Sequence, residues 1–117
     1  MKLLRMKPEY ISWVKSGKKH ATTRLKSKGL NCDFELVSGS RFKPVKSGVI
    51  IYVHELWCWS LDSLNAMSPS LKRKLFEAEG FESWEEFWNV LKEINKDKGV
   101  NEKTLWFTHW FNEVKKI

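Results

Sequence analysis

The residues with the clearest chemical potential lie between Lys15 and Lys28, where six side chains are basic and none is acidic. Within this stretch Lys19, Thr22 and Arg24 form a Lys-x-x-Thr-x-Arg pattern. Crowding by other cations, or partial desolvation, lowers the pKa of a lysine, which can then act as a base or nucleophile. A lysine–hydroxyl pair can activate an oxygen, and an arginine can hold phosphate or carbonyl oxygens. The pattern is short enough to arise by chance, and a solvated basic surface is the alternative interpretation.

The charge of the chain is distributed unevenly. Its 117 residues include 21 Lys and Arg against 14 Asp and Glu, for a formal net charge of +7. Residues 1–48 hold 12 basic and 3 acidic side chains (net +9), residues 49–117 hold 9 and 11 (net −2), and the two sum to +7. Such asymmetry points to a polyanionic partner, most often nucleic acid. It distinguishes neither RNA from DNA nor a binding domain from an enzyme.

Composition excludes several classes of protein. Apolar residues make up 42% of the chain and charged residues 30%, which is typical of a folded domain. The length predicts one domain that spans residues 1–117. The longest apolar run, residues 49–53, falls far short of the roughly 18 residues of a membrane span. Residues 1–7 are too few and too charged for a secretory signal, so we expect a cytoplasmic protein with no membrane partner.

The cysteines and histidines do not predict a metal site. Cys32 and Cys58 are too few for a four-cysteine zinc site, and with the three histidines they show no C-x-x-C or H-x-x-x-H spacing. We therefore expect no metal and no cofactor. Both cysteines are interpreted as ordinary, half-buried thiols.

Aromatic residues are abundant, with 7 Trp and 7 Phe in this short chain. They indicate a compact core of large rings, because each ring buries about 150–250 Å². Base stacking is the functional alternative. A group at helical spacing is assigned mostly to the core and comprises Trp84, Phe87, Trp88, Leu91 and Ile94.

A helix and a strand must position the Lys-x-x-Thr-x-Arg pattern. The sequence predicts a helix over residues 8–16, with proline in its first turn and Gly17 just past its end. Residues 20–25 are rich in strand formers. On a strand, Thr22 and Arg24 share one face, and the more apolar opposite face includes Thr23. We therefore expect Thr22 and Arg24 to face a polar cleft or solvent.

The remaining pattern predicts an α+β domain with a small sheet or barrel. Ser68-Pro69 predicts the start of a helix that ends near Gly80, and the Ser-x-x-Glu capping box at 83–86 predicts a helix over 84–95. Residues 61–64 predict a single helical turn. The expected strands lie at residues 34–37, 41–45, 49–53 (continuing toward 59) and 104–114.

Resemblance to a known family supports the chemical interpretation. Residues 17–24, Gly-Lys-Lys-His-Ala-Thr-Thr-Arg, resemble the signature of the ASCH domain (activating-signal-cointegrator homology), within the PUA-like superfamily. The chain has Cys32-Asp33 where many members have Gly-Asp. Further similar segments follow in order over nearly the whole chain: a hairpin at 36–44, a strand at 49–53 leading to 61–64, an "EGF-S-EEF"-like segment at 78–87 and a closing strand at 105–111.

The resemblance implies a small β-barrel with helices packed around it. It also implies a cleft lined by the basic motif and suited to RNA or to a nucleoside or nucleotide. RNA or nucleotide binding through this cleft is the function we expect first. The residues assigned to nucleic-acid binding are Lys18, Lys19, Arg24, Lys26, Lys28, Arg41 and Lys43.

The alternative that the resemblance implies is a small amidohydrolase that deacetylates N4-acetylcytidine or a related modified nucleoside. By motif position its catalytic residues are Lys19, Thr22 and Glu79. Amide hydrolysis needs an activated oxygen, stabilisation of an oxyanion and a proton for the leaving amine. In this hypothesis Lys19 takes a proton from Thr22 or water, Thr22 attacks the acetyl carbonyl, and Lys19 then protonates N4. Glu79 orients Lys19 or accepts from the substrate amine; a structural ion pair is its alternative role.

Two further hypotheses remain open. A ribonuclease would need an acid–base pair, and no histidine pair at useful spacing supplies one, although a lysine could substitute. A scaffold that binds a protein partner through exposed tryptophans is the other, and no sequence feature supports it specifically.

Overall fold

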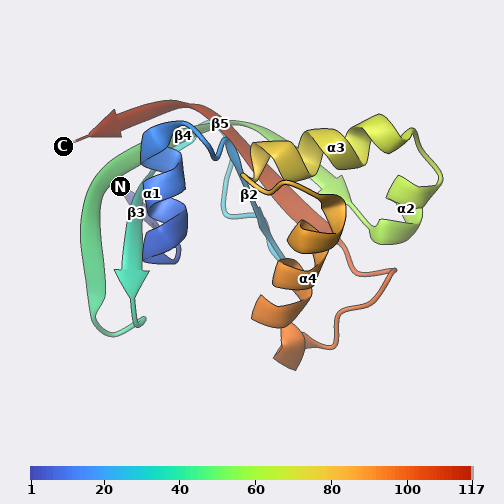
Figure 1. Cartoon of the computed structure of the whole chain (residues 1–117). Coiled ribbons are helices and arrows are strands. Elements are labelled where there is room, and N and C mark those ends of the chain that lie inside the picture. Colours follow the sequence, from blue (N-terminus) through green and yellow to red (C-terminus); the bar gives the residue numbers. More distant parts are fainter. Residues whose placement is uncertain (117) are drawn as a thin grey trace.

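The structure is a computed structural model that describes residues 1–116, apart from the side chain of Glu113 (Figure 1). This part of the chain forms five strands, four α-helices and one 3-10 turn. In order they are β1 (Lys2–Arg5), α1 (Pro8–Ser16), β2 (Ala21–Arg24), β3 (Cys32–Gly39), β4 (Pro44–Trp59), α2 (Leu61–Asn65), α3 (Pro69–Ala78), α4 (Trp84–Ile94), η1 (Lys96–Lys98) and β5 (Trp106–Lys116). The predicted α+β class is confirmed.

All five strands belong to one sheet, in the order β1-β3-β4-β5-β2. The central strand β4 is 16 residues long and pairs antiparallel with β3 on one side and β5 on the other. The prediction of two separate strands at 41–45 and 49–53 is therefore wrong. Gly48, which lies between these two ranges, falls where the β3–β4 register shifts between Glu35 and Val37. Glycine is well suited to such a bulge, and pairing on both edges carries β4 through it.

The sheet curves without closing. Its edge strands are β1 and β2, and no backbone pairing joins them within residues 1–116. The closed barrel that the resemblance implied is therefore not formed in this part of the chain. A side chain crosses the gap instead: the Arg24 guanidinium Nη2 donates to the Arg5 carbonyl oxygen at 2.9 Å. Pocket-lining side chains, rather than a strand ladder, occupy the space between the two edges.

Two apolar clusters flank this gap. The first packs α1 against β1, β3 and β4 and includes the buried Ile11, Val14 and Phe34. The second packs α3 and α4 against the far ends of β4 and β5, around Trp59 and Trp106. Figure 1 shows α1 at one end of the curved sheet and α2, α3 and α4 at the other. The partly buried ring of Tyr10 contacts both clusters, so it marks where they meet.

The helices follow the sequence signals closely. Helix α1 has the predicted bounds, with Pro8 in its first turn and Gly17 as its C-cap. Ser68 and Ser83 cap α3 and α4 through their side chains, as the sequence predicted. Strand β1 was not predicted, because its four residues show no clear alternation and pair only with the distant β3. Within residues 1–116 no helix has the length and apolarity needed to cross a membrane.

Candidate functional site

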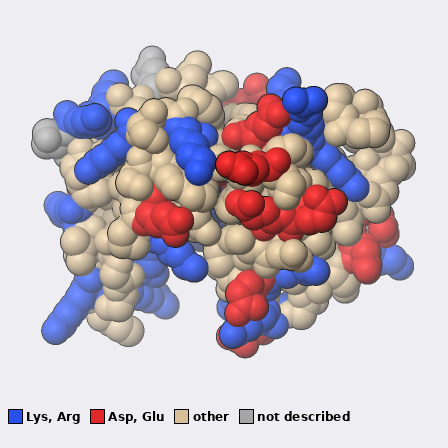
Figure 2. Space-filling view, in the orientation of Figure 1, with Lys and Arg blue, Asp and Glu red and all other residues tan. Residues whose placement is uncertain are grey.

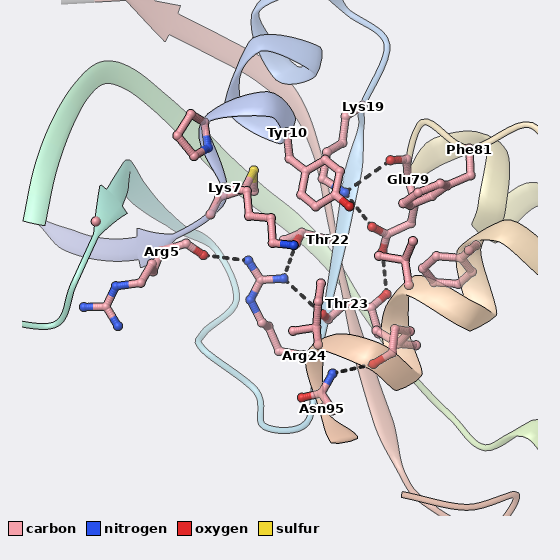
Figure 3. Close-up of a pocket in the computed structure, with 17 residues that line it drawn as sticks. Arg5, Lys7, Tyr10, Lys19, Thr22, Thr23, Arg24, Glu79, Phe81 and Asn95 are labelled. Atoms are coloured by element: carbon pink, nitrogen blue, oxygen red, sulfur yellow. Dashed lines mark hydrogen bonds and ion pairs between the residues drawn. The ribbon is translucent and has the colours of Figure 1, made fainter. Parts of the chain in front are cut away.

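A pocket of about 390 Å³ opens between the edge strands and helix α4 (Figure 3). Residues from β1, α1, β2 and the segment after α3 form its polar part. Residues of α4 form an apolar wall opposite. The residues that line the pocket include Arg5, Lys7, Tyr10, Lys19, Thr22, Thr23, Arg24, Gly39, Glu79, Phe81, Phe87, Val90, Leu91 and Ile94.

A buried ion pair lies in this pocket. Lys19 Nζ is 2.6 Å from Glu79 Oε1, and each side chain is only 4% exposed. Nζ also donates to the Glu79 carbonyl oxygen at 3.2 Å. The two residues are 60 positions apart and meet because the His20 amide donates to the Ala78 carbonyl oxygen at 2.6 Å. This bond joins the start of β2 to the end of α3, so both ends present their side chains to one point.

Gly80 makes this approach possible. Its φ of +95° is a left-handed conformation that side-chain-bearing residues rarely adopt. A Cβ at this position would lie 2.8 Å from the ring of Trp13 in α1. The glycine therefore lets the chain turn sharply after Glu79 while the ring of Trp13 lies against the turn. The Gly in the "EGF"-like segment has a structural role that supports the position of Glu79.

The chemistry of Lys19 is changed by its surroundings. Burial lowers the pKa of its ammonium group, because a charge is disfavoured away from water. Glu79 opposes this shift through its charge and hydrogen bond, and the nearby cation Arg24 adds to it. The net direction is a lowered pKa. Lys19 is thus a base that holds its proton less firmly than a solvated lysine does, beside a carboxylate that fixes its position.

Arg24 organises the adjacent hydroxyl. Its Nη1 donates to Thr22 Oγ1 at 2.6 Å and to the Thr23 carbonyl oxygen at 3.0 Å, and its Nη2 donates to Arg5 as described above. Burial lowers the pKa of the Arg24 guanidinium, but arginine stays protonated in proteins. Thr22 Oγ1 therefore accepts a charge-assisted hydrogen bond, and its own proton remains available to a ligand.

A second set of hydrogen bonds holds Glu79 from beneath. Thr23 Oγ1 donates to Glu79 Oε2 at 2.5 Å and lies 2.7 Å from Thr108 Oγ1, and Trp59 Nε1 donates to Thr108 Oγ1 at 2.7 Å. Because Thr23 spends its proton on the carboxylate, the Thr108 hydroxyl must be the donor to Thr23. Each hydrogen bond in this series is then donated in the direction of Glu79. We call Lys19, Glu79, Thr23, Thr108 and Trp59 the pocket floor.

His109, on β5, contacts the backbone of β2 at Thr22. Its Nε2 accepts from the Lys28 amide at 2.9 Å, so Nδ1 carries the proton and faces the Thr22 carbonyl oxygen at 3.2 Å. The ring is fully buried. Burial lowers the pKa of this imidazole, although its bond to Thr22 opposes the shift. His109 is therefore interpreted as a neutral structural group that fixes the backbone of Thr22.

Helix α4 gives the pocket its apolar wall. Phe87 and Leu91 are buried at its base, and Val90 and the 54%-exposed Ile94 continue the surface toward the opening. The ring of Phe81, just before the helix, packs against Phe87 with centroids 5.6 Å apart. One side of the pocket thus offers rings and aliphatic groups, and the other offers hydrogen-bonding groups.

Comparison with solved structures identifies the fold. The ASCH protein of Zymomonas mobilis superposes with a TM-score of 0.56 at 14% identity, covering 95% of this chain and 66% of that one. The ASCH domain of Lactobacillus crispatus gives a TM-score of 0.57 at 15% identity over 95% and 79%. A protein of Enterococcus faecalis gives 0.63 at 20% identity over 92% and 71%.

This chain has the ASCH-domain fold. At these identities the likeness concerns the fold alone, and it agrees with the resemblance of residues 17–24 to the ASCH signature. No model of a protein family matches the chain, and no curated protein matches it.

Among the predicted catalytic residues, the ASCH fold brings Lys19 and Glu79 into direct contact and places Thr22 in the same pocket. The expected pairing of Lys19 with Thr22 is replaced by two contacts: Thr22 accepts from Arg24, and Lys19 donates to Glu79. The reason is that the β2 alternation turns Thr22 and Thr23 to different sides, so Glu79 meets Thr23 instead.

The predicted nucleic-acid-binding residues divide into two groups. Lys19 and Arg24 line the pocket. The others are exposed and lie outside its lining: Lys18, Lys26, Lys28, Arg41 and Lys43. Lys18 places its Nζ 3.9 Å from the ring centroid of Trp13, a cation–π contact. One basic motif thus supplies a buried, neutralised lysine and several solvated ones.

Sequence reasoning missed several residues of the pocket floor. Thr23 was assigned to the apolar face of its strand, and Thr108 and Trp59 were not singled out at all. The β2–β5 register, which sets Thr23 opposite Thr108, was the signal needed, and it is not readable from either strand alone. Among the residues that the structure describes, no cluster of three or more His, Cys, Asp and Glu could hold a metal.

Proposed function

We propose that this protein binds one nucleoside or nucleotide unit, free or within RNA, in the pocket beside Lys19 and Glu79. The observation that carries the proposal is the two-sided lining: an apolar wall on α4 faces the polar side chains of β2 and Glu79. A nucleobase has flat apolar faces and hydrogen-bonding edges, so it matches such a pocket. The volume of about 390 Å³ lies within the range of about 300–1,000 Å³ for small-molecule sites.

The charges of the pocket favour a base and sugar inside it and a phosphate at its opening. Glu79 neutralises Lys19, and two backbone carbonyls and Thr22 accept from three of the five N–H donors of Arg24. The remaining cations among the lining residues, Arg5 and Lys7, are exposed. A phosphate at the opening would keep its hydration and gain their attraction.

A charge placed on the apolar wall tests this proposal. Ile94→Glu puts a carboxylate at the opening, and Leu105→Glu is the matched control because Leu105 is similarly exposed (57% against 54%) and lies outside the lining. We expect Ile94→Glu to weaken binding of nucleosides and 5′-monophosphates by about tenfold or more, and Leu105→Glu to leave it unchanged. Calorimetric titration measures both. Absence of binding by the wild type, or equal loss in the two variants, would contradict the proposal.

The second candidate is the amidohydrolase, and the 2.6 Å contact between Lys19 and Glu79 in the pocket that holds Thr22 favours it. Lys19 would first pass a proton to Glu79 and so become neutral. Thr22 Oγ1 would then attack the acetyl carbonyl of N4-acetylcytidine, with its proton passing to the neutral Lys19 directly or through water. Arg24, which already donates to Thr22 Oγ1, would stabilise the negative charge on the oxyanion of the tetrahedral intermediate. The C–N4 bond would break as Lys19 protonates N4, and water would then release acetate from Thr22.

Release of cytidine from N4-acetylcytidine tests the second candidate. Thr22→Ser keeps a hydroxyl and should retain turnover, whereas Thr22→Val removes it and should lower turnover by at least about 100-fold. Thr104→Val is a control at a threonine outside the pocket. If the wild type releases no cytidine, or if Thr22→Val turns over as fast as Thr22→Ser, this candidate is wrong and the binding proposal is unaffected.

A further inference from the structure

The hairpin between β3 and β4 combines an exposed aromatic ring with exposed cations. Phe42 at its tip is 90% exposed, and the flanking Arg41 and Lys43 are exposed as well. Lys46 follows on β4, and residues 36–48 contain no acidic side chain. We call residues 39–46 the basic arm. A phenylalanine this exposed contributes nothing to the core, so its neighbours suggest a different role.

The basic arm begins at the pocket itself. Gly39 lines the pocket and starts the hairpin turn with a φ of +82°. A Cβ there would lie 2.7 Å from the Lys43 carbonyl oxygen, so the tight turn requires glycine. Phe42 follows Gly39 by three residues, and chain length alone keeps their Cα atoms within about 11 Å. The exposed ring is therefore close to the pocket opening.

The cations of the N-terminal segment extend the same surface. Strand β1 pairs with β3 so that Arg5 lies opposite Val37, and the Met6 amide donates to the Val37 carbonyl oxygen at 2.8 Å. Arg5 and Lys7 consequently lie between the pocket and the basic arm. Residues 1–7 contain no acidic side chain.

The other side of the opening has the opposite charge. Residues 77–93 hold six acidic side chains, of which only Glu79 is buried, and a single basic one, Lys92. Figure 2 shows basic side chains gathered at the left, on the side of the β3–β4 hairpin, and acidic ones concentrated across the centre. A polyanion that enters the pocket is therefore repelled along α4 and attracted along β1 and the basic arm.

We propose that the basic arm binds the strand of a single-stranded nucleic acid whose neighbouring nucleoside occupies the pocket. This inference rests on the proposed nucleoside-binding function and adds the polymer and its direction. Phe42 stacks on one base, while Arg41, Lys43 and the cations at the pocket opening contact phosphates. A duplex does not fit, because both the enclosed pocket and the Phe42 ring require bases removed from a helical stack.

The test measures how the basic arm discriminates a strand from a single nucleotide. The probes are a fluorescein-labelled, mixed-sequence single-stranded RNA of about eight nucleotides, a DNA of the same sequence, and unlabelled nucleoside 5′-monophosphates. The variants are Phe42→Ala and the double variant Arg41→Gln/Lys43→Gln. Their matched controls are Leu105→Ala, an exposed apolar residue elsewhere, and Lys98→Gln/Lys103→Gln, which removes the same net charge outside the pocket lining.

We expect Phe42→Ala to weaken binding of the RNA or DNA strand by about tenfold and to leave monophosphate binding unchanged. The double charge variant should make the negative slope of log K against log salt concentration shallower by about 1.4, since each of two phosphate contacts with a single strand contributes about 0.7. The controls should change neither quantity. Preference for RNA over DNA would indicate contacts to the 2′-hydroxyl. Weaker binding of either strand by the basic-arm variants supports the inference.

Three results would overturn the inference. The strand binds no more tightly than a monophosphate; the control variants weaken strand binding as much as the arm variants; or a polyglutamate peptide displaces the RNA as effectively as unlabelled RNA does. In each case monophosphate binding in the pocket is measured separately, so the nucleoside-binding function can stand while the role of the basic arm fails.

Discussion

The pocket floor and the basic arm handle positive charge in opposite ways. In the floor, Lys19 is almost completely buried and is paired with Glu79, whose second oxygen is held by Thr23. In the arm, Arg41 and Lys43 are solvated and have no ion-pair partner among the described residues. Lys19 of the floor and the cations of the arm come from the same basic N-terminal part of the sequence, residues 1–48.

The difference follows from solvation. A buried charge is costly unless it is paired and hydrogen-bonded, so the floor must be complete and rigid to exist at all. A solvated charge costs little and acts over about 8–10 Å at ordinary salt concentrations, so the arm needs no fixed partner. The floor is therefore suited to precise positioning of a ligand and the arm to salt-dependent attraction.

The largest effect is expected from breaking the floor at Glu79. Glu79→Ala leaves Lys19 buried and unpaired and should lower the free energy of unfolding by about 3–5 kcal/mol, measured by urea denaturation. The matched control is Glu77→Ala, two residues earlier, which removes an exposed ion pair with Arg73. It should change the denaturation midpoint little, because exposed pairs contribute little. Equal losses in the two variants would show that Lys19 is not dependent on its partner.

A smaller loss of stability is expected from a substitution at Thr108. Thr108→Val leaves the Trp59 indole N–H without its acceptor and should cost about 1–3 kcal/mol. In a Trp59→Phe background the donor is already gone, so the same substitution should cost less. A double-mutant cycle with urea denaturation measures this coupling. An identical cost in both backgrounds would contradict the hydrogen-bond chain described for the floor.

The pH dependence of stability tests His109. Its pKa in the folded state is lowered below the ordinary value of 6.5. As the pH falls from 6.5 toward the folded-state pKa, the unfolded chain binds more protons than the folded one, so acidification favours unfolding. The free energy of unfolding should therefore fall below about pH 6.5, by at most about 1.4 kcal/mol per pH unit from this group. His109→Gln should remove that part of the slope, and His54→Gln, at an exposed histidine, should keep it. A slope unchanged in His109→Gln would show that the ring is not held neutral.

The smallest effect on stability is expected in the arm. Phe42→Ser should leave the free energy of unfolding within about 0.5 kcal/mol of the wild type, because the ring is 90% exposed. Thermal and urea denaturation both measure this. A clear loss of stability would mean that Phe42 packs against the protein in solution, and the contrast between a structural floor and a binding arm would no longer hold.

Much of the local structure could be predicted because its signals are local. Pro8 and Gly17 bound α1, and side-chain oxygens of Ser68 and Ser83 cap α3 and α4. Strand β1 and the continuity of β4 could not be predicted, because both depend on pairing with distant strands. The aromatic helix shows the same limit: Phe87 is buried, as predicted for most of its group, whereas Ile94 is exposed and lines the pocket.

By itself the sequence determined the residue types of the site and their local order: a lysine, a hydroxyl and an arginine on one turn and strand, and a glutamate before a Gly-Phe. Only the tertiary structure decided which of them meet. The fold brings the carboxylate of Glu79 against the ammonium of Lys19, 60 positions earlier in the chain. The alternation of β2 makes Thr23, rather than Thr22, the second partner of Glu79, and the β2–β5 register sets Thr108 opposite Thr23. The physical reason is that a buried charge needs ion-pair and hydrogen-bond partners nearby in space. The spacing of residues along one strand does not specify which distant residues the fold brings close to it.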